Sequence, residues 1–309
     1  MANESTRKKW KGKERKKSDK VMDPRDVSVN DFIIPIMGPT GVGKSTFVNT
    51  AAGRDVMTVG HDLKACTAQL HHVVVNHPAH PETRIVFVDT PGFDDTFESD
   101  YEILRRISVW LAQSYSDNMK IAGVIYLHEI TQKRMYGSTR KNLDMFHELC
   151  GHESGKNIVL ATSKWGNILE DAGARFENQL KTTFWKDLVE EGSSVERFLG
   201  TSESAWAVVD HVVREHQQLI ALHIQKELVD LQKLLPETKA GDSLRKSLQE
   251  ILETHQKTVK ELQESKDPAR AQERLREAQT KIQVSIDEIK KLQGKPSLGE
   301  RISQWLCFR

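Results

Sequence analysis

The sequence predicts an α/β fold: a mostly parallel sheet of six strands with one antiparallel edge strand, flanked by helices and followed by a helical, coiled-coil-like C-terminal extension. Three observations support this prediction. A glycine-rich segment, Gly38 to Thr46, separates a short apolar run from a helix-forming segment. Strand-like and helix-like segments then alternate over residues 28–235, which is typical of a parallel sheet covered by helices. From Ser204 onward the composition shifts to helix formers with frequent Gln, Glu and Lys.

The first strand is expected at Phe32–Met37, and the helix after the glycine-rich segment is expected to end at Gly53. The segment between them matches the pattern G-x-x-x-x-G-K-[ST], in the strand, loop and helix order that a phosphate-binding loop requires. Glycines allow successive backbone N–H groups to face phosphate oxygens, and the helix N-terminus adds its positive dipole. The residues expected around the phosphates are Gly38, Pro39, Thr40, Gly41, Val42, Gly43, Lys44, Ser45 and Thr46.

Two side chains of this loop have separate expected roles. Lys44 supplies a positive charge to the β- and γ-phosphates, and the Ser45 hydroxyl is a ligand for Mg²⁺. The implied ligand is therefore a nucleoside triphosphate with magnesium.

The next two strands are expected at Leu70–His77 and Thr83–Thr90, joined as an antiparallel hairpin. The second of them leads into DTPG, where Asp89 can hold a magnesium-bound water and the Gly92 N–H can reach the γ-phosphate. In the loop before the hairpin, the Thr67 hydroxyl is expected to complete the magnesium coordination, which makes that loop a nucleotide-sensitive switch.

The remaining elements of the domain follow from hydrophobic periodicity. Helices are expected at about Tyr101–Tyr115, Thr139–Cys150 and Arg175–Glu190, and strands at Ile121–His128, Asn157–Ser163 and, more weakly, Val195–Leu199.

The C-terminal part carries a weak heptad pattern that is interrupted at Pro268. It predicts two helices of a hairpin or a kinked coiled coil. The alternative is an amphipathic helix pair packed back on the core. The last residues, SLGERISQWLCFR, predict an amphipathic helix that either docks on the globular part or contacts a membrane or a partner. The expected organisation is a basic disordered arm (1–27), the α/β domain (28–235) and a helical extension (236–309).

GPTGVGKS, the Cys66-Thr67 pair and DTPGFDD together resemble the translation-factor class of P-loop GTPases. More narrowly they are similar to septins, chloroplast import GTPases and GTPases of immunity-associated proteins, and the segment from GVIYLHEIT onward is similar to fungal proteins with a single G domain. The resemblance covers residues 28–215 and implies a P-loop G domain that binds GTP or GDP and hydrolyses GTP slowly. It also implies homodimerisation through the nucleotide face, as in several relatives.

The base-reading box departs from that family. Its usual form is N-K-x-D, whereas this sequence has TSKW at Thr162 to Trp165, without a carboxylate in the fourth position. Lys164 can lay its aliphatic stem on the purine, and Ser163 and the Trp165 ring are included among the expected base-binding residues. GTP is favoured because immunity-associated relatives also have a variant that begins with Thr, and ATP stays open.

A second departure concerns the attacking water. Phe93 occupies the place of the glutamine that orients water in many small GTPases, and a phenyl ring cannot polarise water. Three replacements are considered: Asp94 or Asp95, His128 at the end of its strand, or Arg134 delivered from a second molecule. For His128 and Arg134 the alternatives are a hydrogen-bonded strand end and a solvated loop residue.

Charge and cysteine content indicate which partners and which cellular compartment to expect. The net charge is +1, but residues 7–20 are strongly basic, so the arm either meets an anionic membrane, nucleic acid or an import receptor, or is inert. No specific nucleic-acid partner is expected. Three cysteines without metal-ligand spacing suit a reducing compartment. We expect a cytoplasmic protein, with peripheral membrane contact left open.

Three functional hypotheses follow. The leading one is a Mg²⁺-dependent GTP-hydrolysing switch that pairs through its G domains and uses the helical extension as an effector or regulatory element. The second is a nucleotide-bound scaffold that barely hydrolyses. The third, a P-loop kinase, fits the loop but lacks any arginine-rich lid.

Overall fold

The computed structural model describes residues 31–57, 70–93, 99–119, 121–132, 137–214, 220–263 and 268–293. The predicted basic arm and the predicted terminal amphipathic helix lie outside these ranges. Within them, no helix combines the length and the apolar character needed to cross a membrane.

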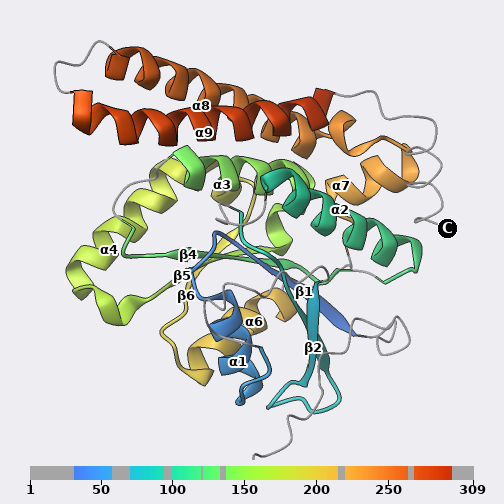
Figure 1. Cartoon of the computed structure of the whole chain (residues 1–309). Helices are drawn as coiled ribbons and strands as arrows, with labels where there is room; N and C mark the ends of the chain where they lie inside the picture. Colours follow the sequence, from blue (N-terminus) through green and yellow to red (C-terminus); the bar gives the residue numbers. More distant parts are fainter. Residues whose placement is uncertain are drawn as a thin grey trace, which may run out of the picture.

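A six-stranded sheet forms the centre of the molecule (Figure 1). Its strand order is β2-β3-β1-β4-β5-β6, in which β2 is antiparallel to β3 and every other neighbouring pair is parallel. This confirms the predicted fold class. The strands are β1 (Phe32–Met37), β2 (His71–Asn76), β3 (Arg84–Asp89), β4 (Val124–Glu129), β5 (Ile158–Ser163) and β6 (Ser194–Arg197).

Two helices, α1 (Lys44–Ala52) and α6 (Ser202–Arg214), cover one face of the sheet (Figure 1). Phe47 of α1 and Trp206 of α6 are buried in one hydrophobic cluster with Phe87 of β3 and Leu127 of β4. Because alternate residues of a strand point to opposite faces, Tyr126 of β4 joins the cluster on the other face.

The other face is covered mainly by α2 (Asp100–Ser116) and α3 (Gly137–Cys150). The single helix expected near residues 175–190 is divided into α4 (Glu170–Gln179), a π-helical turn (Leu180–Phe184) and α5 (Lys186–Glu190). A short helix, α7 (His223–Gln225), continues into a second π-helical turn, Lys226–Asp230.

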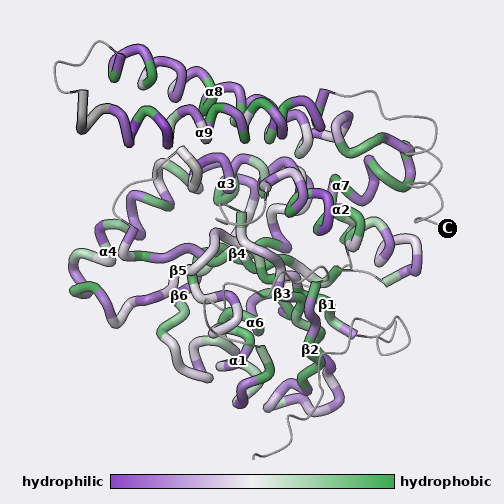
Figure 2. The backbone as a smooth tube through the Cα atoms, in the orientation of Figure 1, coloured by the Kyte–Doolittle hydropathy of each residue, from purple (hydrophilic) through white to green (hydrophobic). Residues whose placement is uncertain are grey.

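The extension forms a hairpin of two long helices, α8 (Lys239–Gln263) and α9 (Pro268–Gln293), that lies on the outer side of α2 and α3 (Figure 1). Leu248 of α8 and Leu292 of α9 are buried in the same hydrophobic cluster as Leu149 of α3, so the hairpin packs back on the domain. Further along α8, His255 and Thr258, two positions of the predicted heptad pattern, are only half-buried. Figure 2 shows that hydrophobic residues concentrate in the central strands, whereas α8 and α9 mix hydrophilic and hydrophobic residues.

Candidate nucleotide-binding site

The phosphate-binding loop leaves the carboxyl end of β1 and turns into α1. Three of its residues, Gly38, Gly41 and Gly43, have φ angles of +133°, +83° and +100°. Residues other than glycine rarely adopt this backbone conformation. A Cβ on Gly38 would lie 2.2 Å from the Leu127 carbonyl oxygen. The loop can therefore approach β4 this closely only with glycine at position 38.

Lys44 is the first residue of α1, and its side chain folds back across the loop. Its Nζ donates hydrogen bonds of 2.9 Å to the carbonyl oxygens of both Gly38 and Pro39, and only 8% of the residue is exposed. The ammonium is thus held inside the curve of the loop, where a charged polyphosphate would compete with two neutral carbonyls for it.

Ser45 and Asp89 bring α1 and the end of β3 together beside this ammonium. The Ser45 hydroxyl donates a hydrogen bond of 2.8 Å to Asp89 Oδ2. Burial raises the pKa of Asp89, and the Lys44 charge and the Ser45 hydrogen bond oppose that rise. The other carboxylate oxygen, Oδ1, is buried and has no hydrogen-bond partner among the described residues.

This donor set fits a magnesium ion. Mg²⁺ prefers oxygen ligands and is commonly held by one or two carboxylates or hydroxyls together with substrate phosphates. A cation beside Asp89 would offset the cost of burying its charge, which the surrounding side chains offset only in part. Among the described residues, Ser45 and Asp89 are therefore those that would hold the metal.

The DTPG segment packs directly on the phosphate-binding loop. The Thr40 hydroxyl donates to the Gly92 carbonyl oxygen at 3.1 Å, and the Thr40 N–H donates to the Phe93 carbonyl oxygen at 3.4 Å. A Cβ on Gly92 would lie 2.4 Å from the Thr40 nitrogen, so position 92 has no room for a side chain. The Phe93 side chain is buried in the hydrophobic cluster under α2, where it cannot contact an attacking water.

The end of β5 is joined to the same loop. The Ser163 hydroxyl lies 2.7 Å from the Val42 carbonyl oxygen and 3.2 Å from that of His128. The next residue, Lys164, has a left-handed backbone with φ +62°, and its Nζ contacts Glu129 Oε2 at 2.6 Å. Ser163 therefore lies beside the phosphate-binding loop, and Lys164 follows it directly in the chain.

Glu129 was not among the expected site residues. Partial burial raises its pKa, but hydrogen bonds from Lys164 and Thr131 outweigh this and hold the pKa below its ordinary value, so Glu129 is charged. It fixes the Lys164 stem rather than offering a free carboxylate to a base. The only sequence signal for it was a carboxylate at the end of an apolar strand, which does not reveal its partner.

The expectation that the Trp165 ring packs on the purine is not supported. The residue is buried in the core, and its indole N–H donates to the Thr162 hydroxyl at 3.0 Å. The Arg197 guanidinium lies 4.0 Å from the ring centroid, and a Cβ on Gly173 would lie 2.6 Å from a ring carbon. These neighbours occupy the ring, so we leave Trp165 out of the base-binding residues.

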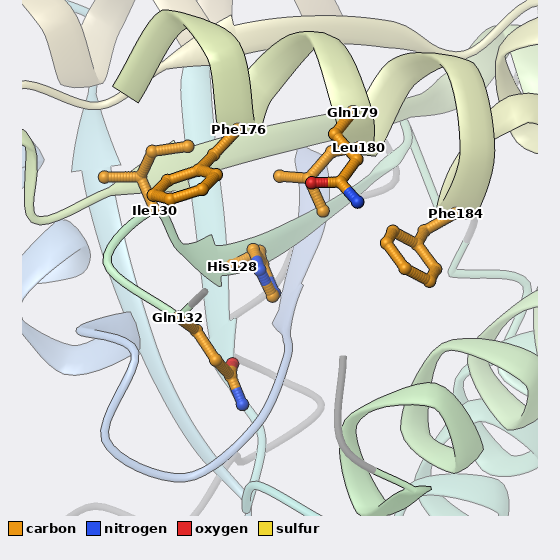
Figure 3. A pocket seen from close by; sticks show the side chains of 7 residues that line it. All are labelled: His128, Ile130, Gln132, Phe176, Gln179, Leu180 and Phe184. Atoms are coloured by element: carbon orange, nitrogen blue, oxygen red, sulfur yellow. The ribbon is translucent and has the colours of Figure 1, made fainter. Parts of the chain in front are cut away.

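His128 is also placed differently from the expectation. Its side chain is fully buried and packs edge-on against the Trp185 ring, with 5.8 Å between the ring centroids. It borders a small cavity, shown in Figure 3, with Ile130, Gln132, Phe176, Gln179, Leu180 and Phe184. Burial lowers the pKa of His128 to about 4.

No residue of the phosphate-binding loop borders this cavity. The reason is strand alternation, because His128 shares its face of β4 with Tyr126, whereas α1, which follows the loop, covers the opposite face together with Leu127. The interpretation of His128 as a water-orienting residue is therefore not supported. The other expected contributors to magnesium binding and catalysis, Thr67, Asp94, Asp95 and Arg134, lie outside the described residues.

The fold and the site define a P-loop nucleotide-binding domain of the G-domain type. Known proteins agree with this class. Residues 33–164 match the family described as 50S ribosome-binding GTPase.

Curated relatives and a solved structure are also consistent with a G domain. GTP-binding protein A of Dictyostelium discoideum is 27% identical over 145 residues, which are 46% of this chain and 30% of that protein. GTPase Era of Agrobacterium fabrum is 37% identical over 111 residues, which are 36% of this chain and 32% of that protein. The chain thus spans well under half the length of these two relatives.

The chain also resembles a solved structure of the chloroplast translocon components atToc33 and psToc159, for whose GTPase activity dimerization is important. The match covers 65% of this chain and 88% of that one, with a TM-score of 0.50 and 16% identity. At this identity the likeness shows the fold. Taken together, the family match and the curated relatives support a GTPase-type G domain in this chain.

Proposed function

We propose that this protein is a Mg²⁺-dependent guanine-nucleotide switch that hydrolyses GTP slowly to GDP and phosphate. The observation that carries the proposal is the hydrogen bond between Ser45 and the half-buried Asp89 beside the Lys44 ammonium. A loop built for polyphosphate and an adjacent oxygen pair suited to magnesium are the two parts that phosphoryl transfer from a nucleotide requires.

In the proposed reaction a water attacks the γ-phosphorus in line with the leaving oxygen. The amides of the loop and Lys44 stabilise the charge that develops on the phosphate oxygens. Mg²⁺, when bound, would neutralise charge on the β- and γ-phosphates. Gly92 lies against Thr40 of the loop, and its N–H is proposed to contact the γ-phosphate. The Thr67 hydroxyl is proposed to complete the magnesium coordination from the loop before β2.

Slow turnover follows from the position after Gly92. Because Phe93 is buried in the core, it contributes no polar group to orient water. The proposed activator is Arg134 from a second molecule, with Asp94 or Asp95 as the alternative within the chain. An arginine delivered in this way stabilises transition-state charge and raises turnover by about a thousandfold or more in other systems.

Guanine is the proposed base. The Lys164 ammonium is held by Glu129 at the end of β4, and its stem can lie on a purine face. No carboxylate follows Lys164 at the place that usually reads guanine, so we expect weaker discrimination against ATP than in a GTPase with the full box.

Pairing through the nucleotide faces is part of the proposal. It is supported by the resemblance to septins and chloroplast import GTPases and by the translocon components, for whose GTPase activity dimerization is important. The narrower likeness to fungal single-domain proteins and a cytoplasmic or peripheral membrane location stay predictions.

The helical extension is proposed to report the nucleotide state. Helix α2 follows the DTPG segment, and its first residues contact both α3 and α9. Asp100 forms a buried ion pair with Lys141 of α3, while Lys291 of α9 lies 3.8 Å from Glu102 and faces the Tyr101 ring. A shift of α2 with nucleotide would therefore change the contacts of the hairpin.

The second candidate is a nucleotide-bound scaffold that barely hydrolyses. The buried Phe93 favours it, because the residue directly after Gly92 then has no polar group that could orient a water. The two candidates share the binding site and differ in turnover.

Binding is tested by calorimetry of the full chain with GTP, GDP, ATP and ADP in the presence of Mg²⁺. We expect GTP and GDP to bind and the adenine nucleotides to bind at least about tenfold more weakly. Lys44→Ala should weaken GTP binding by about 100-fold or more, whereas Lys290→Ala, an exposed lysine of α9, should leave it unchanged. Equal affinity for adenine and guanine would contradict the GTPase assignment.

Turnover is tested by phosphate release as a function of protein concentration. The switch predicts Mg²⁺-dependent release that rises faster than linearly with concentration. A strictly linear rise would contradict activation by pairing. Protein that keeps intact GTP for hours at high concentration would favour the scaffold.

A further inference from the structure

Three side chains capable of binding a metal meet at the surface, away from the phosphate-binding loop. They are His147 in the last turn of α3, His152 in the 3₁₀ turn that follows it (His152–Asn157), and Glu191 just after α5. His147 Nε2 lies 2.7 Å from one carboxylate oxygen of Glu191, and His152 Nδ1 lies 2.5 Å from the other.

This cluster lies at the amino ends of the parallel strands, whereas the nucleotide site lies at their carboxyl ends. The 3₁₀ turn leads into the amino end of β5, and the segment after Glu191 leads into the amino end of β6. The phosphate-binding loop leaves the carboxyl end of β1, and β1, β4, β5 and β6 run parallel. A ligand at the cluster would therefore not touch the nucleotide.

We propose that His147, His152 and Glu191 form a binding site for a divalent transition-metal ion, with Zn²⁺ as the best-fitting ion. Two imidazoles and one carboxylate are a common zinc donor set, with water as the fourth ligand. The ligand atoms all lie within 4.8 Å of one another. Zinc–ligand bonds of ~2.1 Å in a tetrahedron require ligand atoms ~3.4 Å apart, so small side-chain rotations convert the present hydrogen bonds into metal bonds.

The backbone that carries these ligands is held in place. A Cβ on Gly155 would lie 2.3 Å from the Glu191 carbonyl oxygen, and the Ser193 hydroxyl donates to the Gly155 carbonyl oxygen at 3.1 Å. The Glu191 N–H donates to the Asp187 carbonyl oxygen at 2.9 Å. The two ligand-bearing segments are thus packed backbone to backbone, which lowers the entropic cost of assembling a metal site.

Charge and access also suit a cation. The carboxylates of Glu148 and Asp187 act on His152 in addition to Glu191, so the surroundings are rich in negative charge. The His152 side chain is 70% exposed, and Glu191 is 20% exposed. The open side allows the ion to enter and leaves room for a water ligand.

The site would serve stability rather than hydrolysis. It ties the end of α3 to the end of α5 in front of two neighbouring strands, so an ion bound there would stabilise the folded state by mass action. The proposal is independent of the nucleotide function.

The test is zinc titration of the chelator-treated full chain by calorimetry, with millimolar Mg²⁺ and GDP present to occupy the nucleotide site. We expect one Zn²⁺ per chain. His152→Ala should weaken binding at least tenfold, and the double variant His147→Ala/His152→Ala should abolish it. The matched control is His80→Ala, because His80 is exposed and pairs with a single carboxylate, Glu82; it should bind zinc as the wild type does.

Thermal unfolding supplies the second readout. Zinc should raise the melting temperature of the wild type and of the His80→Ala control, and should leave that of the double variant unchanged. Circular dichroism without metal checks that each variant is folded. The proposal is overturned if the wild type binds no zinc at micromolar concentration, or if the double variant binds as well as the wild type.

Discussion

The Ser163 hydroxyl donates a 2.7 Å hydrogen bond to the Val42 carbonyl oxygen, across 121 positions of sequence. It joins the end of β5, where a base is proposed to bind, to the loop that is proposed to bind the phosphates. The two ends of the nucleotide site are therefore fixed relative to one another, and binding at one end constrains the other.

Ser163→Ala should weaken nucleotide binding by about tenfold and lower the free energy of unfolding by about 1–2 kcal/mol, because the buried Val42 carbonyl loses its donor. Calorimetry and denaturant unfolding measure the two effects. Thr254→Ala is the matched control, since it removes an exposed helix hydroxyl. An affinity loss no larger in Ser163→Ala than in Thr254→Ala would contradict a role for this hydrogen bond in the site.

Arg197→Ala should lower the free energy of unfolding by about 1–3 kcal/mol and leave nucleotide affinity unchanged. The guanidinium covers the Trp165 ring and makes two hydrogen bonds, of 2.9 and 2.8 Å, to the Glu177 carboxylate. Urea unfolding and nucleotide titration of the same sample separate the two effects. If Trp165→Phe lowered GTP affinity without changing stability, the ring would have to be returned to the base site.

His128→Gln should leave the rate of phosphate release within about twofold of wild type, because a buried ring on the far face of β4 makes no contact with the phosphates. The assay is steady-state phosphate release from pH 6 to 8. A loss of turnover on the scale of general-base catalysis, about 100-fold, would show that His128 reaches the reacting water.

The same histidine should make the fold sensitive to acid. Burial lowers its pKa from an ordinary 6.5 to about 4, so the unfolded chain takes up a proton that the folded state does not. The stability that the neutral ring provides is complete above pH 6.5 and is lost as the pH falls toward 4, by on the order of 3 kcal/mol. Urea unfolding at several pH values should show this slope in wild type and a smaller one in His128→Gln.

Glu288→Gln should stabilise the folded protein at neutral pH by about 1 kcal/mol. Glu288 is a buried residue of α9, and one of its carboxylate oxygens has no hydrogen-bond partner among the described residues. Burial and the nearby Asp100 raise its pKa, against the opposing charges of Lys141 and Lys291.

The raised pKa of Glu288 determines how its contribution to stability changes with pH. Between the unfolded value of 4.5 and the higher folded value, the folded state binds a proton that the unfolded state has released. The contribution of Glu288 therefore falls as the pH rises through that window. Thermal unfolding from pH 4 to 8 should show a flatter upper limb for Glu288→Gln, and an unchanged or steeper limb would contradict the assignment.

Local sequence was sufficient for the fold class and for part of the site. The glycine pattern between an apolar run and a helix located the loop, because the conformation it imposes depends on adjacent residues. Asp89 was found for the same reason, as a carboxylate at the end of a buried run. The structure then brings Lys44, Ser45 and Asp89 together through contacts that these local signals implied.

Residues that only adjoin a motif were harder to place. Trp165 and His128 both neighbour expected site residues, yet one packs under Arg197 and the other beside Trp185. Their positions depend on which face of a strand or turn they occupy and on what packs there. The partners Glu129 and Val42 stand 35 and 121 positions away from Lys164 and Ser163, beyond the reach of any local pattern.

The sequence by itself thus determined a phosphate-binding loop, the carboxylate expected at the magnesium site (Asp89), and an alternation of strands and helices. Each of these is encoded by the spacing of residues that are near neighbours in the sequence. Only the tertiary structure decided which strand-end side chains reach that loop and that the α8–α9 hairpin docks on α2 and α3. It also decided that His147, His152 and Glu191 meet at the amino ends of β5 and β6. These outcomes depend on strand order and packing between distant segments, which burial of apolar surface selects over the whole chain at once.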